Sequence, residues 1–286
     1  MLYLNQLKTS IQIDFSNLIG GKMKKVLVTI LMGLIFVSCG TSSLKNPRED
    51  QKFYKLFDGV VLDQNELIAM IKEYSKNAES VVNKQAVDLA ENFIEENNYS
   101  ELLFKNSQSS KHYSDFEESF FKFIDLPVAR KLNLLRLKEF DAVEFTKYID
   151  NFSKTEDAAK RLDLIEKIVQ NDFPSFYQGD FSSKLILMIS EYDSSKKKLT
   201  AYRSIKSNFK LVTLQLNLYL FQAVPVETLT EIVKVQKNSE YKKGRAFIEE
   251  VQLKTNEEYL EMLSKRLEEN GIEKVDFAAI LENRSI

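Results

Sequence analysis

The sequence predicts an all-α fold, an irregular multi-helix bundle of amphipathic helices that follows an N-terminal segment of different character. The 286 residues include only 8 glycines and 4 prolines, so an all-β fold would have few residues from which to build its turns. Apolar residues make up 44% of the chain, which is enough for a sizeable core at this length. Helix-capping patterns recur along the sequence. Long helices are therefore the expected elements.

The N-terminal segment has a pattern typical of protein export. Lys24 and Lys25 precede the mostly apolar residues 26–37, which are followed by Ser38 and Cys39. A charged part, an apolar part and a small residue in this order make up a signal peptide. A helix that spans a bilayer needs about twenty apolar residues, which is more than this run provides. An uncleaved anchor and a buried apolar helix are the alternatives.

The run Phe36-Val37-Ser38-Cys39 resembles the cleavage motif of bacterial lipoprotein precursors cut by signal peptidase II, with phenylalanine where leucine is usual. The resemblance implies that Cys39 receives a diacylglycerol on its sulfur, that the chain is cleaved between Ser38 and Cys39, and that a further acyl chain such as palmitate follows. Each methylene buried in lipid contributes roughly 0.8 kcal/mol, so several chains hold firmly. The resemblance thus implies a lipid-anchored protein outside the cytoplasm, on the cell membrane or outer membrane.

Residues 1–22 do not fit this signal, because an export signal begins within a few residues of its lysines. Gly20-Gly21-Lys22 must be encoded by GGN-GGN-AAR, which would be a purine-rich ribosome-binding site directly before an ATG codon. We therefore expect translation to begin at Met23, with residues 1–22 as an artificial extension and residues 23–38 as the signal peptide.

Residues 39–52 are expected to form a lipidated, flexible tether. They are polar after the cysteine, contain Pro47 and show no apolar periodicity. As a random coil, the thirteen residues 40–52 that follow Cys39 span roughly 20 Å. Residues 53–286 would then form the α-helical domain, and a division into two subdomains near residues 171–174 is an open alternative.

Four residue pairs have the spacing of a capping box, in which a side-chain oxygen accepts a backbone N–H and a Glu three residues later reaches back. They are Asp63/Glu66, Ser114/Glu117, Asp141/Glu144 and Ser153/Glu156. Two apolar stripes follow the first pair, one of Leu67, Ile68, Ile71 and Tyr74 and one of Val82, Ala86, Leu89, Ala90, Phe93 and Ile94. Pro127 and Pro174 suit the first turns of further helices, and residues 156–170 continue the helical pattern.

Residues 210–221 are ambiguous, because leucines alternate with polar residues as they would in a strand. A single strand would leave its backbone groups unpaired, and the sequence offers no convincing partner strand. Leucine is also a good helix former. We therefore predict a nearly fully buried central helix. Helices are expected next over residues 227–237, 239–270 and 276–281, with Gly271 as a left-handed stop.

Residues 226–245 resemble an uncharacterised family of exported bacterial helical domains. The signature of that family places a glycine thirteen residues after a Glu, between two helices, and Glu231 and Gly244 have this spacing. Arg245 supplies the usual basic residue, whereas Asn238 and Tyr241 depart from the pattern. The resemblance implies a helical hairpin and no activity.

The charge balance limits the partners. Removal of residues 1–38 takes away four Lys and one Asp, which leaves 36 basic and 41 acidic residues and a net charge of −5. A nucleic-acid binder needs a concentrated basic face, so this balance argues against nucleic acid as a partner. It also argues against electrostatic docking on anionic lipid.

The residue types that carry catalysis are scarce. His112 is the only histidine, and a serine nucleophile would need it as a base, so we predict no catalytic residue. Zinc sites of His and Cys are excluded by the same scarcity, and no glycine-rich nucleotide motif occurs, so we expect no metal or cofactor. Lys196, Lys197 and Lys198 form a run typical of a solvated helix turn, with phosphate or lipid headgroups as alternative partners.

These observations favour a non-catalytic, lipid-anchored protein of the cell envelope that binds an envelope protein or has a structural role. The bilayer is its first expected partner, through acylated Cys39. Two alternatives remain open. An envelope hydrolase would need two acidic residues about 5 to 9 Å apart in a cleft, and a carrier of an apolar ligand would need an enclosed apolar cavity.

Overall fold

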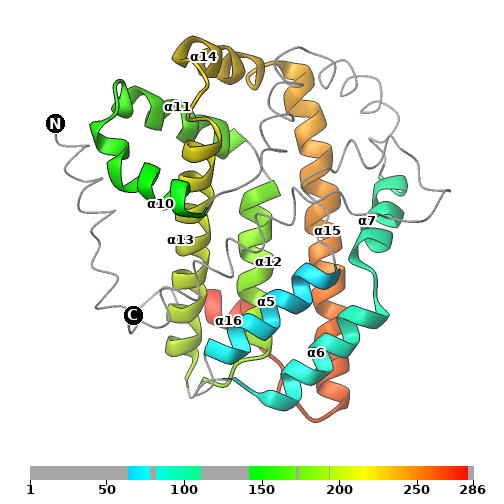
Figure 1. The fold of residues 1–286 in the computed structure, drawn as a ribbon. Coiled ribbons are helices and arrows are strands. Elements are labelled where there is room, and N and C mark those ends of the chain that lie inside the picture. Colours follow the sequence, from blue (N-terminus) through cyan, green and yellow to red (C-terminus); the bar gives the residue numbers. More distant parts are fainter. Residues whose placement is uncertain (1–63, 78–81, 111–141, 172–173, 193, 283–286) are drawn as a thin grey trace. The chain divides into compact units, whose positions relative to one another are not determined.

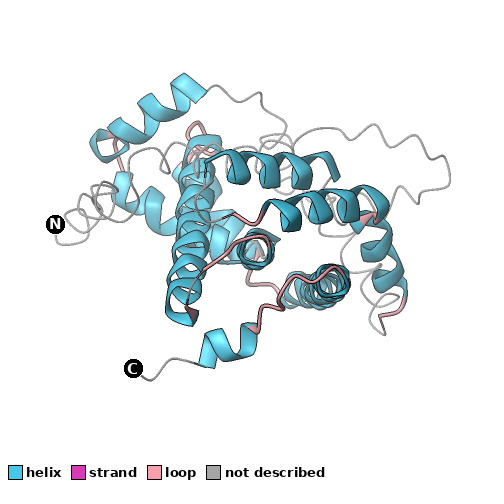
Figure 2. Ribbon diagram, turned by 90° about the horizontal axis from the view of Figure 1, so that it is seen from below, coloured by secondary structure: helices cyan, strands magenta, loops and turns pink. Residues whose placement is uncertain are grey.

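The computed structural model describes residues 64–77, 82–110, 142–171, 174–192 and 194–282. Within these residues the structure is helical and contains no strand, which confirms the predicted all-α fold. Figure 1 labels the helices and Figure 2 shows them from a second direction. The predicted signal peptide and tether, including Ser38 and Cys39, lie outside the described residues, as do His112, Pro127 and the Ser114/Glu117 pair.

The elements, in chain order, are α5 (Gln64–Asn77), α6 (Lys84–Glu96), α7 (Tyr99–Gln108), α10 (Ala142–Asn151), the 3₁₀ turn η1 (Phe152–Lys154), α11 (Ala158–Asn171), α12 (Pro174–Met188), α13 (Ser195–Leu220), α14 (Val226–Val235), α15 (Ser239–Glu269) and α16 (Phe277–Glu282). Pro174 is the first residue of α12, as its fixed φ predicts.

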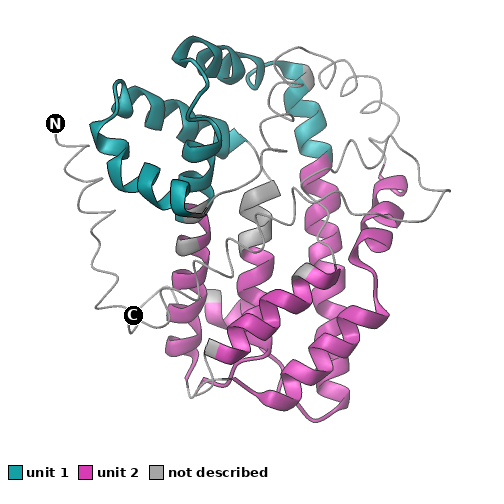
Figure 3. Cartoon of the chain, in the orientation of Figure 1, with its two compact units in different colours: residues 1–24, 111–173, 211–247 teal, residues 25–110, 174–210, 248–286 magenta. Residues whose placement is uncertain are grey.

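The chain divides into two compact units, which Figure 3 colours separately. Unit 1 comprises residues 1–24, 111–173 and 211–247, and unit 2 comprises residues 25–110, 174–210 and 248–286. One boundary falls after residue 173, and two others fall inside α13 and α15. Each unit is therefore assembled from segments that are far apart in the sequence.

Asparagine side chains cap the N-termini of two helices of unit 2. The Asn83 Oδ1 accepts a hydrogen bond from the Ala86 backbone N–H at 3.0 Å at the start of α6. The Asn98 Oδ1 does the same for Ser100 at 2.9 Å at the start of α7. Val82, which we placed in the helical stripe, instead precedes α6 and pairs with Ser190 in an isolated bridge. The cap at Asn83 explains this difference, because it fixes the helix start after Val82.

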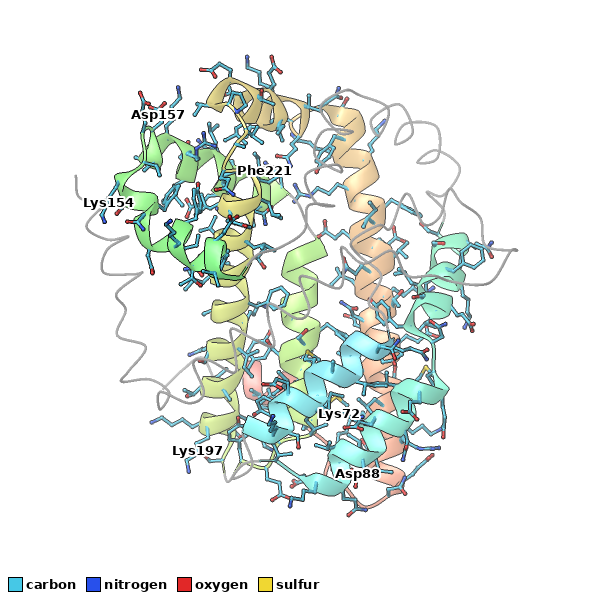
Figure 4. The ribbon with its side chains drawn as sticks, in the orientation of Figure 1. Lys72, Asp88, Lys154, Asp157, Lys197 and Phe221 are labelled. Atoms are coloured by element: carbon cyan, nitrogen blue, oxygen red, sulfur yellow. The ribbon has the colours of Figure 1, made fainter. Side chains whose placement is uncertain are left out.

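The core of unit 2 contains the apolar stripes expected for α5 and α6. Their buried members are Leu67, Ile71, Tyr74, Ala86, Ala90, Phe93 and Ile94. The two helices are also joined at their surfaces, where the Lys72 Nζ lies 3.3 Å from a carboxylate oxygen of Glu91. Lys72 is labelled on α5 in Figure 4. Burial of one stripe per helix is therefore the main source of cohesion.

The predicted capping box at Ser153/Glu156 is wrong. Ser153 lies inside η1, and the next helix begins only at Ala158. Phe152 is buried at 2% exposure, so the chain turns directly after α10 to bury this ring. Asp157 then takes a left-handed φ of 57°, and its carbonyl accepts the first backbone hydrogen bond of α11, from Arg161 at 2.8 Å. Tertiary burial has overridden a local signal.

Residues 210–220 belong to α13, so the helix predicted across the alternating leucines is confirmed. The expectation of nearly complete burial is wrong, because Leu214 and Leu220 are only half-buried. Leu216, Leu218 and Tyr219 supply the buried face. The end of this helix is held by Arg161, which hydrogen-bonds the carbonyl of Phe221, labelled in Figure 4.

The long helix predicted over residues 239–270 is observed as α15. It ends at Gly271, which has a φ of +81° as expected. The Ile272 N–H bonds the Leu267 carbonyl and the Gly271 N–H bonds the Glu268 carbonyl, both at 3.0 Å. This pair of bonds is a Schellman motif, which satisfies carbonyls that the helix end would otherwise leave unpaired.

The family resemblance of residues 226–245 implied that Gly244 lies between two helices, and this is wrong. Gly244 is buried within α15, and the break between α14 and α15 lies at residues 236–238. The Asn238 carbonyl accepts the first bond of α15, from the Lys242 N–H at 3.0 Å. Asparagine is a favoured residue at this capping position, which explains why the break falls there.

Candidate functional site

One cluster in unit 2 brings charged and titratable groups of two helices together, and we call it the Asp180 cluster. It consists of Asp180 and Lys184 of α12 with Tyr202 and Lys206 of α13. Each pair is four residues apart and therefore lies on one helix face. The two faces are in contact, since Asp180 hydrogen-bonds Tyr202 and Lys206.

Asp180 is the centre of the cluster. Its Oδ1 accepts hydrogen bonds from the Tyr202 hydroxyl and from the Lys206 Nζ, the latter at 2.8 Å. Its Oδ2 lies 2.9 Å from the Lys184 Nζ. The Lys206 Nζ also donates to the Tyr202 hydroxyl at 3.1 Å. Three donors thus converge on one carboxylate.

The electrostatics of the cluster follow from these contacts. Burial raises the pKa of Asp180. Hydrogen bonds from Lys206, Tyr202 and Lys184 lower this pKa by a larger amount, so the net result is a pKa of about 2. Burial and the bond to Asp180 raise the pKa of Tyr202. For Lys206, burial lowers the pKa, and its bonds to Asp180 and Tyr202 raise it more, so the net shift is upward. Near neutral pH the carboxylate and the ammonium are therefore both charged and the phenol is neutral.

This arrangement suits the joining of helices better than catalysis. A general base needs a pKa near the working pH, and that of Asp180 is far below it. A nucleophile or general acid needs a lowered pKa or a partner base, and the pKa of Tyr202 moves the other way. Lys184 also lies 6.0 Å from the ring centre of Phe277, so the cluster ties α16 to α12.

A second polar region of unit 2 lies between α7 and α15. The Tyr99 hydroxyl donates to the Asn256 Oδ1 at 2.5 Å. The Asn106 Nδ2 donates to the Thr255 Oγ1 at 3.2 Å and to Glu258 at 3.1 Å. Burial raises the pKa of Tyr99, so this hydroxyl stays a neutral donor. Tyr99, Asn106, Thr255 and Asn256 are buried, whereas Glu258 is half-buried and also lies 3.6 Å from the Lys105 Nζ, so these bonds join α7 to α15.

Three aromatic rings, including that of Tyr99, pack together in this region. The ring centre of Tyr99 lies 5.6 Å from that of Phe181 and 5.4 Å from that of Tyr259. The Tyr259 hydroxyl donates to the Asn97 carbonyl at 3.0 Å, which caps the end of α6. Edge-to-face rings of this kind add packing energy beyond their buried area. These rings therefore pack α7, α12 and α15 of unit 2 against one another.

Two buried side chains of unit 2 have polar atoms without a hydrogen-bond partner among the described residues. Gln252 of α15 is 0% exposed, and both its amide oxygen and its amide nitrogen are unpaired. Ser182 of α12 is 2% exposed with an unpaired Oγ. An unpaired buried amide costs about 1–3 kcal/mol. These unpaired atoms lower the stability of the core of unit 2.

Ser190, a buried serine of unit 2, lies close to a tyrosine hydroxyl group. Its Oγ lies 3.1 Å from the Tyr74 hydroxyl and donates to the Ile186 carbonyl at 2.7 Å. Tyr192 also meets the Tyr74 hydroxyl, at 3.3 Å, and burial raises the pKa of Tyr192. A tyrosine with a raised pKa does not activate a serine, so none of the described groups in this cluster is the base that nucleophilic catalysis requires.

In unit 1, the end of α11 is held by residues around the start of α15. The Tyr241 hydroxyl donates to the Asn171 carbonyl at 3.3 Å, and the Arg245 Nη1 donates to the Asn171 Oδ1 at 3.1 Å. The Gln236 Nε2 donates to the Ile168 carbonyl at 3.3 Å. These bonds satisfy carbonyls that a helix end leaves unpaired, so these polar groups are structural.

The structure places few of the residues that the sequence singled out. Ser38, Cys39 and His112 lie outside the described residues, so the lipidation and cleavage predictions stay predictions. Lys196 and Lys197 are exposed on the first turn of α13, where a solvated helix turn was expected. The Asp180 cluster was missed, although the four-residue spacings Asp180/Lys184 and Tyr202/Lys206 are visible in the sequence.

In the described part of the chain, no group of three or more His, Cys, Asp or Glu side chains is arranged to hold a metal ion. None of the helices in this part combines the length and the apolar character needed to cross a bilayer.

Comparison with known protein families, with curated proteins and with solved structures finds no match to this chain.

Proposed function

We propose that the protein is a lipid-anchored component of the cell envelope, held on a bilayer by acylated Cys39. Its helical domain binds an envelope protein or supports the envelope without catalysing a reaction. The observation that carries the proposal is the order of residues at the N-terminus, in which a basic pair, an apolar run and Phe36-Val37-Ser38-Cys39 follow one another.

The described side chains support the non-catalytic part of the proposal. Asp180 accepts bonds from three donors and keeps a pKa of about 2, which makes it a poor base. Ser190 has hydroxyl groups and a backbone carbonyl as neighbours. In both places the hydrogen-bonding capacity is used to hold helices together, which is what a binding or structural module requires.

The anchor is tested by the mass of the mature amino terminus and by membrane fractionation. Because Cys39 is the only cysteine, the unaltered chain is expected to yield one acylated N-terminal peptide that starts at this residue. Cys39→Ser is expected to abolish acylation and cleavage, and to change the migration of the protein. Ser42→Ala, three residues further on, is the matched control and should leave both unchanged.

Unchanged migration and unchanged acylation of the Cys39→Ser chain would contradict the anchor. The binding role is tested separately, by crosslinking the acylated protein in its membranes. A reproducible protein partner is expected on the helical domain. Crosslinking that reaches lipid but never a protein would contradict a role in binding an envelope protein.

A further inference from the structure

The first half of α13 is positively charged, whereas the chain as a whole is slightly acidic. Residues 194–226 contain no acidic residue and six basic ones, namely Lys196, Lys197, Lys198, Arg203, Lys206 and Lys210. The net charge of the full chain is −2. A concentrated positive segment therefore lies within a mildly acidic protein.

The helix places part of this charge on one exposed stripe, which we call the basic face. Lys196, Thr200, Arg203, Ser207 and Lys210 follow one another at intervals of four and three residues, and all five are exposed. The opposite side of the same turns is buried through Leu199, Tyr202, Ile205 and Phe209. Lys197, labelled in Figure 4, lies in the first turn of α13.

Two charges of the basic face, those of Lys196 and Arg203, have no ion-pair partner among the described residues. In the described part of the chain, no acidic group forms an ion pair with Lys196 or Arg203, whereas the neighbouring Lys206 is paired with Asp180 at 2.8 Å. Thr200 and Ser207 are small and neutral, so they do not screen the two cations. Lys196 and Arg203 are therefore available to neutralise an external anion.

We propose that the basic face is a docking surface for anionic lipid headgroups. It extends over about 21 Å from Lys196 to Lys210 at the rise of an α-helix. Its charges lie along a line and are not gathered into one pocket, which fits an extended anionic surface better than a single small anion. Because its apolar side chains are buried in unit 2, α13 lies on the headgroups and does not insert.

This inference rests on the proposed function, since acylated Cys39 is what keeps the domain at a bilayer. Stable membrane attachment commonly combines acyl chains with a polybasic patch. A tether of thirteen residues spans roughly 20 Å, which keeps the domain close to the headgroups. At physiological salt, interactions between exposed charges fade beyond about 8 Å. The local charge of α13 therefore outweighs the net acidity of the chain, which by itself argued against such docking.

Vesicle sedimentation of the full chain carrying Cys39→Ser tests the inference without an acyl contribution. The probes are phosphatidylcholine vesicles and vesicles of equal parts phosphatidylcholine and phosphatidylglycerol. The apolar N-terminal segment contributes to binding of both kinds of vesicle. The readout is therefore the affinity for the mixed, anionic vesicles divided by the affinity for the phosphatidylcholine vesicles. We expect a ratio of at least about thirtyfold at low salt, and a ratio near one at about 1 M salt, where the screening length is about 3 Å.

The variant Lys196→Glu/Arg203→Glu is expected to bring the ratio close to one at low salt. Its matched control, Lys242→Glu/Lys243→Glu, changes the charge equally at two exposed lysines of α15 and should keep the ratio. Circular dichroism verifies that both variants keep their helices. Equal losses in variant and control would overturn the inference, because they would show an effect of net charge alone.

Equal binding of the unaltered face to both kinds of vesicle would also overturn it, and would point to an acidic protein as the partner of α13. Failure of the proposed function is separable from these outcomes. It is read from the mass of the N-terminal peptide of the Cys39 chain, a measurement that the charge of α13 does not affect.

Discussion

Arg161 of α11 is bonded to the backbone at Phe221, sixty residues further along the chain and just beyond the end of α13. Its Nη1 donates to the Phe221 carbonyl at 3.0 Å and to the Val224 carbonyl at 2.8 Å. Carbonyls at a helix end lack partners within the helix, and a cation is favourable there. One side chain therefore fixes the position at which α13 ends in unit 1.

Replacement of Arg161 by methionine should destabilise the protein by about 2 kcal/mol, because two hydrogen bonds from a charged group are lost, although the Phe221 carbonyl keeps its bond from the Val224 N–H at 2.9 Å. Chemical unfolding followed by circular dichroism measures the change. Lys160→Met, at the exposed neighbouring position, is the control and should change the free energy of unfolding by less than about 0.5 kcal/mol. Equal effects of the two substitutions would refute the role of Arg161.

Asp180→Asn should weaken the protein by about 1–2 kcal/mol at neutral pH, after allowance for partial solvent screening. The pKa of Asp180 is lowered from 3.8 to about 2, so its contribution to stability is full above pH 4. This contribution is lost as the pH falls from about 4 to about 2, and the two proteins should converge there. Unfolding curves across this range measure it, with exposed Asp88→Asn as the control. A difference that stays constant down to pH 2 would contradict the assignment.

Gln252→Met should stabilise the protein by about 1 kcal/mol or more, because it removes a buried amide whose atoms have no partner among the described residues. Methionine has a similar length and flexibility, so it fits the same space. Thermal unfolding reports the change. Gln170→Met, at an exposed position of α11, should be nearly neutral. A destabilised Gln252→Met protein would mean that the amide makes a bond that the substitution breaks.

Gly271→Ala should cost about 1 kcal/mol through backbone conformation alone, since the φ of +81° disfavours a β-carbon. No atom lies within 4 Å of the position that the β-carbon would take, so steric overlap is not a cause. Gly271→Asn should cost less, because asparagine tolerates the left-handed region. Equilibrium unfolding of the three proteins gives the order, and a larger loss for asparagine than for alanine would contradict the explanation.

Local signals predicted part of this fold, and tertiary contacts decided the rest. The end of α15 at Gly271 could be predicted because the glycine and the preceding helix are adjacent in the sequence. The start of α11 could not, since it depends on the burial of Phe152 and on the unusual φ of Asp157. Ser153 and Glu156 have the spacing of a capping box, but no helix starts at Ser153.

The Asp180 cluster shows the same limit for a site. The sequence contains the pairs Asp180/Lys184 and Tyr202/Lys206, but only the register of α12 against α13 brings them together. Charged pairs at this spacing are common on solvated helix faces, so spacing alone does not single them out. The motif at Cys39 is different, because a short linear pattern is all that such a prediction needs.

The packed rings of Tyr99 and Tyr259 also give the protein an optical reporter. The chain has 12 tyrosines and no tryptophan, so its near-ultraviolet absorption reflects tyrosine. Burial raises the pKa of both rings, so they should stay neutral at a pH at which a fully solvated phenol ionises. The folded state favours their neutral form, so it loses stability as the pH rises above about 10. Late ionisation at 295 nm would then coincide with the collapse of the helical signal, and one spectrophotometric titration would follow the opening of unit 2.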